Sequence, residues 1–390
     1  MTNDLDLDRD LRDTFHRHEK DLLGRGPTPA PNMFRRIRRR QAGTVLMAAV
    51  AAAAITIAGI SGLDAIRASE QTPASFGPPP TASDPFVSIH AQLDEQLSVD
   101  LFEVRAEQPS YWRLYALDQF DGSRWTSSDP SAANRGQVIT ARGTLDLSDL
   151  SDVPQDTRQL AQTYTILHDL DGPWLPMAYP PETITLASGE VTFDPVLSQA
   201  LLDGGPDEGL EYTVESRIVN PSPQELDEVV FLSAPQYGRY TEVPGSVDPR
   251  VGELAERWTR DEVTAYRKIL AIQRRFVDGS FLYSTDVVPG SQVVTSDVDP
   301  LLDFLTTSRR GFCQQFATAM AIMVRALGYP ARVAVGYRSG TLNDGVYTVE
   351  TKDAHAWVEV FFPGYGWLPF EPTPSRTNPI AAPGTYLNPG

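Results

Sequence analysis

The segment after Cys313 has its hydrophobic residues at the spacing of an α-helix. They share one stripe of that helix and are Phe316, Met320, Met323 and Leu327. Gly328 is placed to end the helix, and Pro330 cannot continue it. We therefore predict a helix that begins at or within a turn of Cys313 and ends near Gly328.

Strands are predicted after this helix, because the side chains there alternate between two faces. The strands cover Ala331–Arg338, Val346–Glu350, a stretch that begins near His355, and Trp367–Glu371. Residues 363–366 read as a turn between the last two strands. Pro369 and Pro372 lack a backbone N–H, so we expect the fourth strand to lie at a sheet edge or to end quickly.

This pattern brings three reactive side chains together. If the turn at 363–366 is tight, Glu371 returns opposite Trp357 and diagonal to His355, within reach of the imidazole. Cys313 lies at a helix N-terminus, where the unpaired N–H groups and the helix dipole favour a thiolate. The sequence therefore predicts Cys313 as nucleophile, His355 as base and Glu371 as the acid that orients the base.

The chain from residue 86 to the helix at Cys313 shows two patterns of hydrophobic spacing. From residue 86 to about residue 244 the pattern is one of short strands and turns, which predicts an antiparallel β-sandwich. The strand candidates are Tyr111–Leu117, Gln162–Leu167, Thr183–Leu186, Glu211–Val219 and Val229–Leu232. Helical spacing returns over Arg250–Val277, and a further helix is predicted at Pro300–Leu305, shortly before Cys313.

The pattern of charged and uncharged residues in the N-terminal part predicts a membrane anchor. Residues 42–63 carry no charge, and a helix of that length is about 33 Å long, enough to cross a bilayer core of about 30 Å. Five arginines at 35–40 precede it and place the N-terminal side in the cytoplasm. A cleaved signal peptide is the competing interpretation. The chain is thus predicted to divide into a cytoplasmic tail (1–41), a transmembrane helix (42–63), a Pro-rich linker (64–85), a β-rich extracytoplasmic domain (86–244) and a catalytic core (245–390).

The tail leaves two interpretations open. Residues 1–32 are polar and mixed in charge, which is typical of a disordered segment. A short helix with leucines along one side is the alternative, and it would bind a cytoplasmic partner.

The net charge of the chain after residue 41 excludes some classes of ligand. The chain has 33 Lys/Arg and 51 Asp/Glu, a net charge of −18. Residues 1–41 have a net charge of +3, so the remainder carries −21. Such an acidic body argues against nucleic acid or anionic lipid as its main ligand. A single cysteine cannot form a disulfide within the chain. A reactive role in chemistry therefore explains the thiol better than a role in disulfide crosslinking.

Several motifs in the C-terminal region resemble the bacterial transglutaminase-like superfamily, and more narrowly its membrane-anchored branch. They are Gly311–Cys313, Arg325–Val333, Gly336–Tyr337, Asp353–Trp357 and Gly366–Thr373. The resemblance implies an α+β fold with a papain-like core, in which N-terminal helices pack on an antiparallel sheet. It also implies that Cys313 accepts the acyl group and His355 is the base. The third residue is usually Asp, whereas this chain has Glu371.

The predicted function is acyl transfer from a peptide or glutamine-type amide through a thioester. The resemblance favours water over an amine as the acceptor, and cell-wall peptides are one class of substrate that fits. A catalytically inactive extracytoplasmic binding module is the alternative, because Glu371 departs from the family pattern and a second oxyanion donor is not identified. We expect no cofactor and no metal, since Asp286, Asp297 and Asp299 are typical of a solvated loop.

Overall fold

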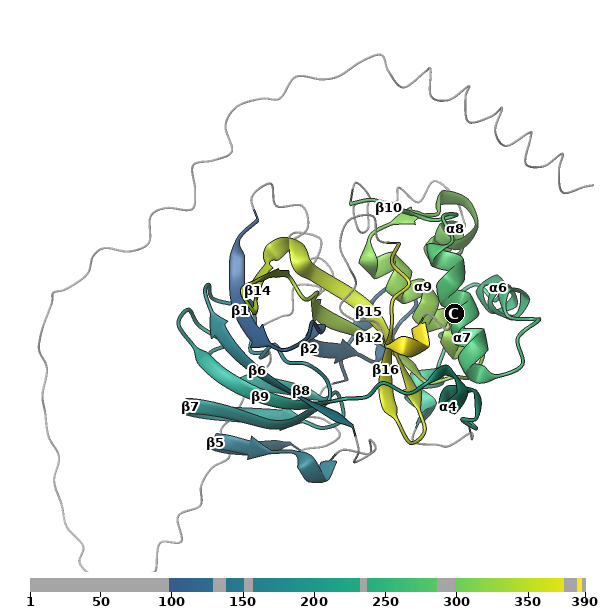
Figure 1. Ribbon diagram of the computed structural model, residues 1–390. Coiled ribbons are helices and arrows are strands. Elements are labelled where there is room, and N and C mark those ends of the chain that lie inside the picture. Colours follow the sequence, from purple (N-terminus) through teal and green to yellow (C-terminus); the bar gives the residue numbers. More distant parts are fainter. Residues whose placement is uncertain are drawn as a thin grey trace, which may run out of the picture. The chain divides into compact units, whose positions relative to one another are not determined.

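The computed structural model describes residues 98–128, 138–150, 157–231, 237–285, 299–374 and 384–387 (Figure 1). All of them belong to one compact unit, Phe76–Gly390. The predicted tail, transmembrane helix and linker lie outside the described residues. Within the ranges given above, none of the helices has the length and apolar character needed to span a membrane. The span at 42–63 therefore stays a prediction.

The helices lie between the two β-rich parts of the chain and before the C-terminal strands. Their bounds are α4 Pro223–Asp227, α5 Gly238–Thr241, α6 Arg250–Trp258, α7 Ala265–Val277, α8 Pro300–Asp303 and α9 Cys313–Ala326. Among the described residues, η1 Ser148–Leu150, η4 Thr351–Asp353 and η5 Thr385–Leu387 are short 3₁₀ turns, and η3 Phe304–Ser308 is a π-helical turn. The predicted helical region over 250–277 is confirmed, but it forms two helices. The second begins because the Thr264 side chain caps it by accepting from the N–H of Arg267.

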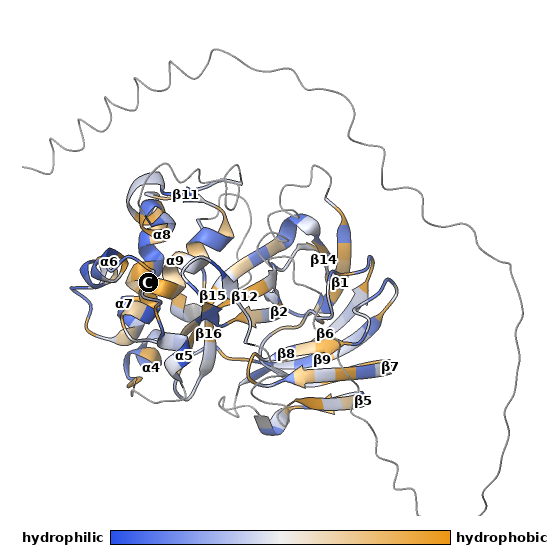
Figure 2. Cartoon of the chain, turned by 180° about the vertical axis from the view of Figure 1, so that it is seen from behind, coloured by the Kyte–Doolittle hydropathy of each residue, from blue (hydrophilic) through white to orange (hydrophobic). Residues whose placement is uncertain are grey.

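A large antiparallel sheet holds most of the N-terminal strands (Figure 1). Its order is β13-β14-β1-β6-β9-β7-β5, and β8 also pairs with β7. The strands are β1 Asp100–Ala106, β5 Ile139–Asp146, β6 Arg158–Ile166, β7 Pro181–Asp194, β8 Gln199–Leu202, β9 Glu211–Ile218, β13 Thr341–Asn343 and β14 Val346–Glu350. Buried and exposed residues alternate along β6 and β9, so one face of each strand contacts the core. Figure 2 shows the same strands coloured by the hydropathy of their residues.

A second antiparallel sheet supports the region of Cys313 and His355. Its order is β16-β15-β12-β2, with β2 Trp112–Leu117, β12 Ala331–Tyr337, β15 Ala354–Phe362 and β16 Gly366–Phe370. Three of the four strands predicted after Cys313 lie in this sheet, and the fourth, β14, lies in the large sheet, so all four are confirmed. Strand β16 is at the edge, as its prolines indicate. The described residues also form two short strand pairs: β3 Gln119–Phe120 with β4 Trp125–Thr126, and β10 Leu282–Tyr283 with β11 Arg310–Gly311.

The sheets do not respect the predicted division of the chain at residue 244. In the large sheet, β1 pairs with β14, which comes from the C-terminal region. In the second sheet, β2 pairs with β12. The prediction of a separate β-sandwich is wrong in this respect, because the N-terminal region gives most of its strands to one sheet and β2 to the other. Alternation along a strand indicates a half-buried face but does not indicate the neighbouring strand.

The predicted strand at Val229–Leu232 is also wrong for residues 229–231, and Leu232 lies outside the described residues. The N–H of Val229 donates to the carbonyl of Leu226, which closes the end of α4. The ring of Phe231 packs edge-on against the rings of Tyr329 and Phe362, at centroid distances of 5.0 and 5.2 Å. These apolar residues anchor a connecting segment on the core instead of joining a sheet.

Helix α9 is the centre of the core. Phe316, Met320 and Met323 are fully buried, and so are the alanines and Ile322 between them. The helix packs on β15 and β12 and contacts α6 and α7. Gly328 follows its end with a φ of 84°, a left-handed conformation that glycine adopts readily. The N–H groups of Gly328 and Tyr329 then donate to the carbonyls of Arg325 and Val324, so the predicted helix end is confirmed.

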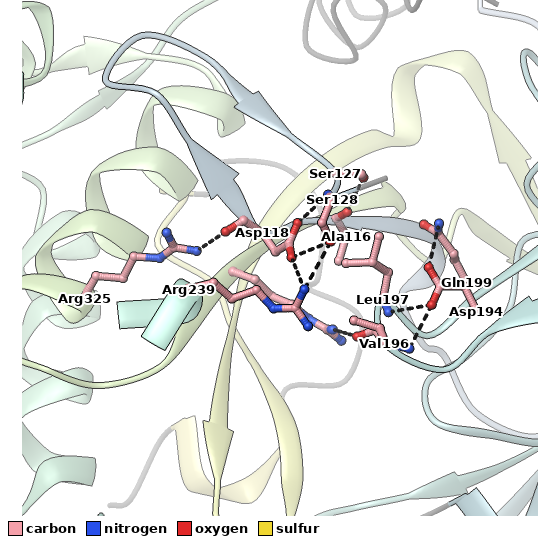
Figure 3. A network of polar contacts seen from close by, with 11 residues as sticks. Ala116, Asp118, Ser127, Ser128, Asp194, Val196, Leu197, Gln199, Arg239 and Arg325 are labelled. Carbon is pink, nitrogen blue, oxygen red and sulfur yellow. Dashed lines mark hydrogen bonds and ion pairs between the residues drawn. The ribbon is translucent and has the colours of Figure 1, made fainter. Parts of the chain in front are cut away.

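A buried polar network joins the C-terminal end of α9 to the segment that follows β2 (Figure 3). Arg325 donates from Nη2 to the carbonyl of Asp118 at 2.7 Å and from Nε to the carbonyl of Ala331 at 2.9 Å. The Asp118 carboxylate accepts from the backbone and hydroxyl of Ser128 and lies 3.5 Å from Arg239. These contacts hold α9 along its axis and thereby determine where its first residue lies.

Candidate active site

Cys313 is the first residue of α9, and its side chain is buried. The helix start is capped by Gln315, whose Oε1 accepts from the N–H of Phe312 at 3.0 Å. Gly311 leaves room for this cap, because a Cβ at that position would lie 2.9 Å from the Cβ of Gln315. The first N–H groups of a helix have no acceptor within that helix. The N–H of Cys313 can therefore donate to the oxyanion that forms when the sulfur attacks a carbonyl group.

His355 lies on β15 directly opposite Gly336 of β12. Its Nε2 is 2.6 Å from Oε2 of Glu371. The side chain of Cys313 is close enough to this imidazole to raise its pKa. Because Nε2 is engaged by Glu371, Nδ1 is the ring nitrogen that remains for the sulfur.

Glu371 follows β16, and the predicted approach of this residue to His355 is confirmed. The register Val358↔Phe370 places Glu371 across from Trp357 and diagonal to His355. The carboxylate is buried and accepts further hydrogen bonds, from the N–H of Thr373 to Oε1 at 2.8 Å and from the hydroxyl of Tyr111 to Oε2 at 2.7 Å. Its own N–H donates to the side chain of Gln273 on α7 at 3.0 Å.

The protonation of this pair follows from burial and charge. Burial alone would lower the pKa of His355, but the Glu371 carboxylate and the hydrogen bonds with Cys313 and Glu371 raise that pKa to about 9. Burial alone would raise the pKa of Glu371, yet the charge of His355 and the hydrogen bonds from His355, Thr373 and Tyr111 hold it below its ordinary value. At neutral pH the pair is therefore an imidazolium and a carboxylate.

The sequence did not indicate two residues that hold Glu371. Tyr111 comes from the segment just before β2, and Gln273 from α7. The rings of Tyr111 and Trp357 are stacked, with centroids 4.4 Å apart. A stacked aromatic pair and a glutamine in a helix are ordinary core features, so their approach to one acid depends on the tertiary fold.

The accessible side of the site includes Tyr283 and Arg338. Tyr283 is 40% exposed, and the pairing of β10 with β11 brings it beside the residues that precede Cys313. Burial and the charge of Cys313 raise the pKa of the Tyr283 phenol, which stays a hydrogen-bond donor. Arg338 donates to the carbonyl of Lys352 and to the Asp353 carboxylate, so it closes the turn that leads into β15.

Among the residues that the structure describes, no group of three or more His, Cys, Asp and Glu side chains is arranged to hold a metal ion. Two acids of the loop before α8, Asp286 and Asp297, lie outside the described residues. The third, Asp299, caps α8 by accepting from the N–H groups of Leu301 and Leu302. Asp299 therefore has a structural role at the start of this helix.

Comparisons with protein families match nearly the whole body of the chain. Residues 252–372 match the core of the transglutaminase-like superfamily. Residues 12–223, which are more than half of the chain, match the TgpA N-terminal domain. Cys313, His355 and Glu371 all lie within the first of these matches.

Two curated relatives are much longer than this chain. One is an uncharacterised protein, YebA, of Bacillus subtilis, which is 37% identical over 147 residues, 36% of this chain and 20% of that protein. The other is a protein-glutamine γ-glutamyltransferase of Pseudomonas aeruginosa, 29% identical over 268 residues, 67% of this chain and 35% of that protein. The chain thus spans about a fifth and about a third of their lengths.

Solved structures agree with these matches. The periplasmic domain of TgpA from Pseudomonas aeruginosa, bound to ethylmercury, superposes with a TM-score of 0.53 at 25% identity. The match covers 74% of this chain and 93% of that domain. A second structure of the same domain gives a TM-score of 0.54 at 24% identity and supports the fold. With the family matches, the shared fold and the Cys-His-Glu arrangement, this chain belongs to the bacterial transglutaminase-like superfamily of cysteine enzymes, with a TgpA N-terminal domain joined to a transglutaminase-like core.

Proposed function

We propose that the chain cleaves peptide or glutamine-type amides through a thioester acyl-enzyme. The observation that carries this proposal is the position of His355, which lies 2.6 Å from the Glu371 carboxylate and whose pKa is also raised by the nearby Cys313. In this arrangement Cys313 attacks as a thiolate, His355 supplies a proton as an imidazolium, and the carboxylate of Glu371 orients the imidazole ring. The matches to the transglutaminase-like superfamily support the same chemistry.

The first half-reaction uses only these residues. The Cys313 thiolate attacks the amide carbon, and the carbonyl oxygen becomes negative. The imidazolium of His355 gives its proton to the departing nitrogen, so the C–N bond breaks and ammonia or an amine leaves. The product is a thioester on Cys313 with a neutral His355 beside it. Glu371 orients the imidazole throughout and stabilises its cationic form.

The second half-reaction returns the enzyme to its starting state. Neutral His355 removes a proton from water or from an amine, which attacks the thioester carbon, and the C–S bond breaks to restore the thiolate. Water gives a carboxylate, and an amine gives a new amide. The preference for water stays a prediction. The name of the Pseudomonas relative, a protein-glutamine γ-glutamyltransferase, supports glutamine as donor and an amine as acceptor.

The developing oxyanion needs donors aimed at it. The N–H of Cys313 is one, because it begins α9. The Tyr283 hydroxyl is our candidate for the second, since its phenol lies in the field of Cys313 and keeps its proton. This assignment gives a role to the short β10–β11 pair, which places Tyr283 opposite Gly311, two residues before the nucleophile.

We also propose that the body works outside the cytoplasm, held by a helix at 42–63. The charge pattern of the sequence supports this, and the solved relative is described as a periplasmic domain. The test is protease treatment of intact spheroplasts that express the chain. Digestion of the body with survival of residues 1–41 supports the proposal, and protection of the body until lysis contradicts it.

The decisive experiment incubates the purified chain with a glutamine peptide and a labelled amine, and analyses the products by mass spectrometry. Hydrolysis converts the carboxamide to a carboxylate, whereas transfer adds the mass of the amine. Cys313→Ala is the control, with its fold checked by circular dichroism, and it should give neither product. Isolated cell-wall peptides are tested in parallel as a second substrate class.

The alternative, an inactive binding module, predicts a different set of results. No substrate would be converted, and Cys313 of the wild type would alkylate with iodoacetamide no faster than a free cysteine at the same pH. The contact between Glu371 and His355 at 2.6 Å favours the enzyme, since the added methylene of Glu does not prevent the pairing.

A further inference from the structure

The acid of the candidate triad is a glutamate, which has one more rotatable bond than an aspartate. A longer side chain loses more rotamer freedom when it is held in a single position. The Glu371 carboxylate is nevertheless held at both oxygens. Oε1 accepts from the N–H of Thr373, and Oε2 accepts from both His355 and Tyr111.

Tyr111 and His355 therefore share one oxygen of Glu371. The Tyr111 hydroxyl is 2.7 Å from Oε2, and Nε2 of His355 is 2.6 Å from the same atom. The ring of Tyr111 lies nearly parallel to those of Trp357 and His355, at centroid distances of 4.4 and 6.0 Å. Burial and the charge of Glu371 raise the pKa of Tyr111 well above its ordinary value, so the phenol remains a donor in the neutral range.

The position of Tyr111 is set by the strand that follows it. The indole N–H of Trp112 donates to the carbonyl of Ser339 at 3.1 Å, and the backbone of Arg113 exchanges hydrogen bonds with Met177 at 2.8 and 3.0 Å. Tyr111 precedes Glu371 by 260 residues, so the contact joins the region of the TgpA N-terminal domain to the transglutaminase-like core.

We propose that Tyr111 is a positioning residue of the triad: it fixes the carboxylate of Glu371 through Oε2 and thereby orients His355 toward Cys313. This inference rests on the proposed function for its kinetic consequences, and on the hydrogen bond and ring stack for its geometry. On this view the N-terminal region completes the active site, and the bond from Tyr111 restrains the additional rotation that Glu has over Asp.

The direction of the effect follows from the hydrogen bond. A donor to a carboxylate stabilises its ionised form. Without the hydroxyl, the pKa of Glu371 rises, and the carboxylate can turn away from His355. The acid side of the pH profile should therefore move to higher pH, and kcat should fall while KM stays the same. A residue that contacts substrate would change KM instead.

The test uses Tyr111→Phe in the full chain, which keeps the ring and removes the oxygen. We expect kcat for the glutamine peptide to fall about tenfold, the loss typical of one hydrogen bond to a charged group. The second measurement is the pH dependence of Cys313 alkylation by iodoacetamide, which requires no substrate. Its acid side should also move to higher pH. Tyr365→Phe, in the turn between β15 and β16, is the matched control and should leave both measurements unchanged.

A double-mutant cycle shows whether the hydroxyl acts through the acid. In a Glu371→Ala background there is no carboxylate to position, so adding Tyr111→Phe should have no further effect on alkylation. A second variant, Glu371→Asp, is used if Tyr111→Phe does not fold. The shorter acid cannot keep both contacts from the same backbone, so kcat should fall although Asp is the usual family residue.

The outcomes separate the two proposals. If the wild type converts no amide, the proposed function fails, while the alkylation profiles still decide the role of Tyr111. A Tyr111→Phe protein with the kcat and alkylation profile of the wild type overturns the inference. So does an equal loss in the Glu371→Ala background, or wild-type kcat in Glu371→Asp.

Discussion

Arg113 of β2 and Glu359 of β15 form a fully buried ion pair, with Nε of the arginine 2.9 Å from Oε1 of the glutamate. The two residues are 246 positions apart in the sequence. Arg332 of β12 binds the other oxygen of Glu359 at 2.7 Å, and all three side chains are at most 2% exposed. The cluster therefore joins three neighbouring strands of the sheet that carries His355.

The first prediction concerns Glu359→Gln. It keeps the volume of the side chain but leaves two buried guanidinium groups without a counter-charge, which costs about 3–5 kcal/mol of unfolding free energy. Urea denaturation monitored by circular dichroism measures this change. Glu190→Gln is the control, because its pair with Arg142 is exposed and such pairs contribute little. Equal stabilities of the two variants would contradict a structural role for the cluster.

The second prediction concerns Gly336→Ala. A Cβ at Gly336 would lie 2.3 Å from the carbonyl oxygen of Trp112 and 2.8 Å from Cα of Arg113, and neither backbone atom can move alone. Strand β2 would have to shift, and Tyr111 with it. We expect a destabilisation of about 1–3 kcal/mol or more and a lower kcat. Gly238→Ala, where a Cβ meets nothing within 4 Å, should be neutral or stabilising in the same thermal-unfolding and activity measurements.

The sequence was sufficient for the local features around the nucleophile. The spacing from Phe316 to Met323 and the glycine at 328 predicted α9, and the alternation after Ala331 predicted β12, β14, β15 and β16. The diagonal approach of Glu371 to His355 also followed, because the turn between β15 and β16 is short and fixes the register. Each of these depends on residues close together in the chain.

Contacts between distant segments could not be predicted in this way. The pairing of β2 with β12 joins residues that lie more than two hundred positions apart in the sequence. Nothing in the alternation of β2 specifies its partner strand. Tyr111 and Gln273 reach Glu371 only once that pairing and the packing of α7 exist. The apolar run at Val229 was misread for a related reason, since helix ends and strands both use such residues to reach the core.

The third prediction tests Tyr283 as an oxyanion donor. Tyr283→Phe removes the hydroxyl but keeps the exposed ring at the site, so substrate affinity should change little. Loss of one such donor typically lowers kcat by about 10²-fold. Steady-state kinetics with the glutamine peptide measure kcat and KM separately. Unchanged kcat, or a change confined to KM, would assign Tyr283 to substrate contact instead. Alkylation of Cys313, which forms no oxyanion, should remain at the wild-type rate.

The last prediction concerns pH. The folded protein raises the pKa of His355 from about 6.5 to about 9, so the imidazolium stabilises the fold fully below pH ~6.5, and this contribution is lost as the pH rises through about 9. Glu371 has a lowered pKa, and its contribution is present above its unfolded pKa and lost as the pH falls through the folded value.

Activity should follow the same pair. The imidazolium is the proton donor of the first half-reaction, so kcat/KM should fall on the basic side near pH 9, and not near the ordinary histidine value of about 6.5. A pH series of kcat/KM and of urea stability measures both effects. In Glu371→Ala the charge that raises the pKa of His355 is absent, so the basic side should move toward neutral pH. A basic side that stays near pH 9 in that variant would show that Glu371 does not control the proton on His355.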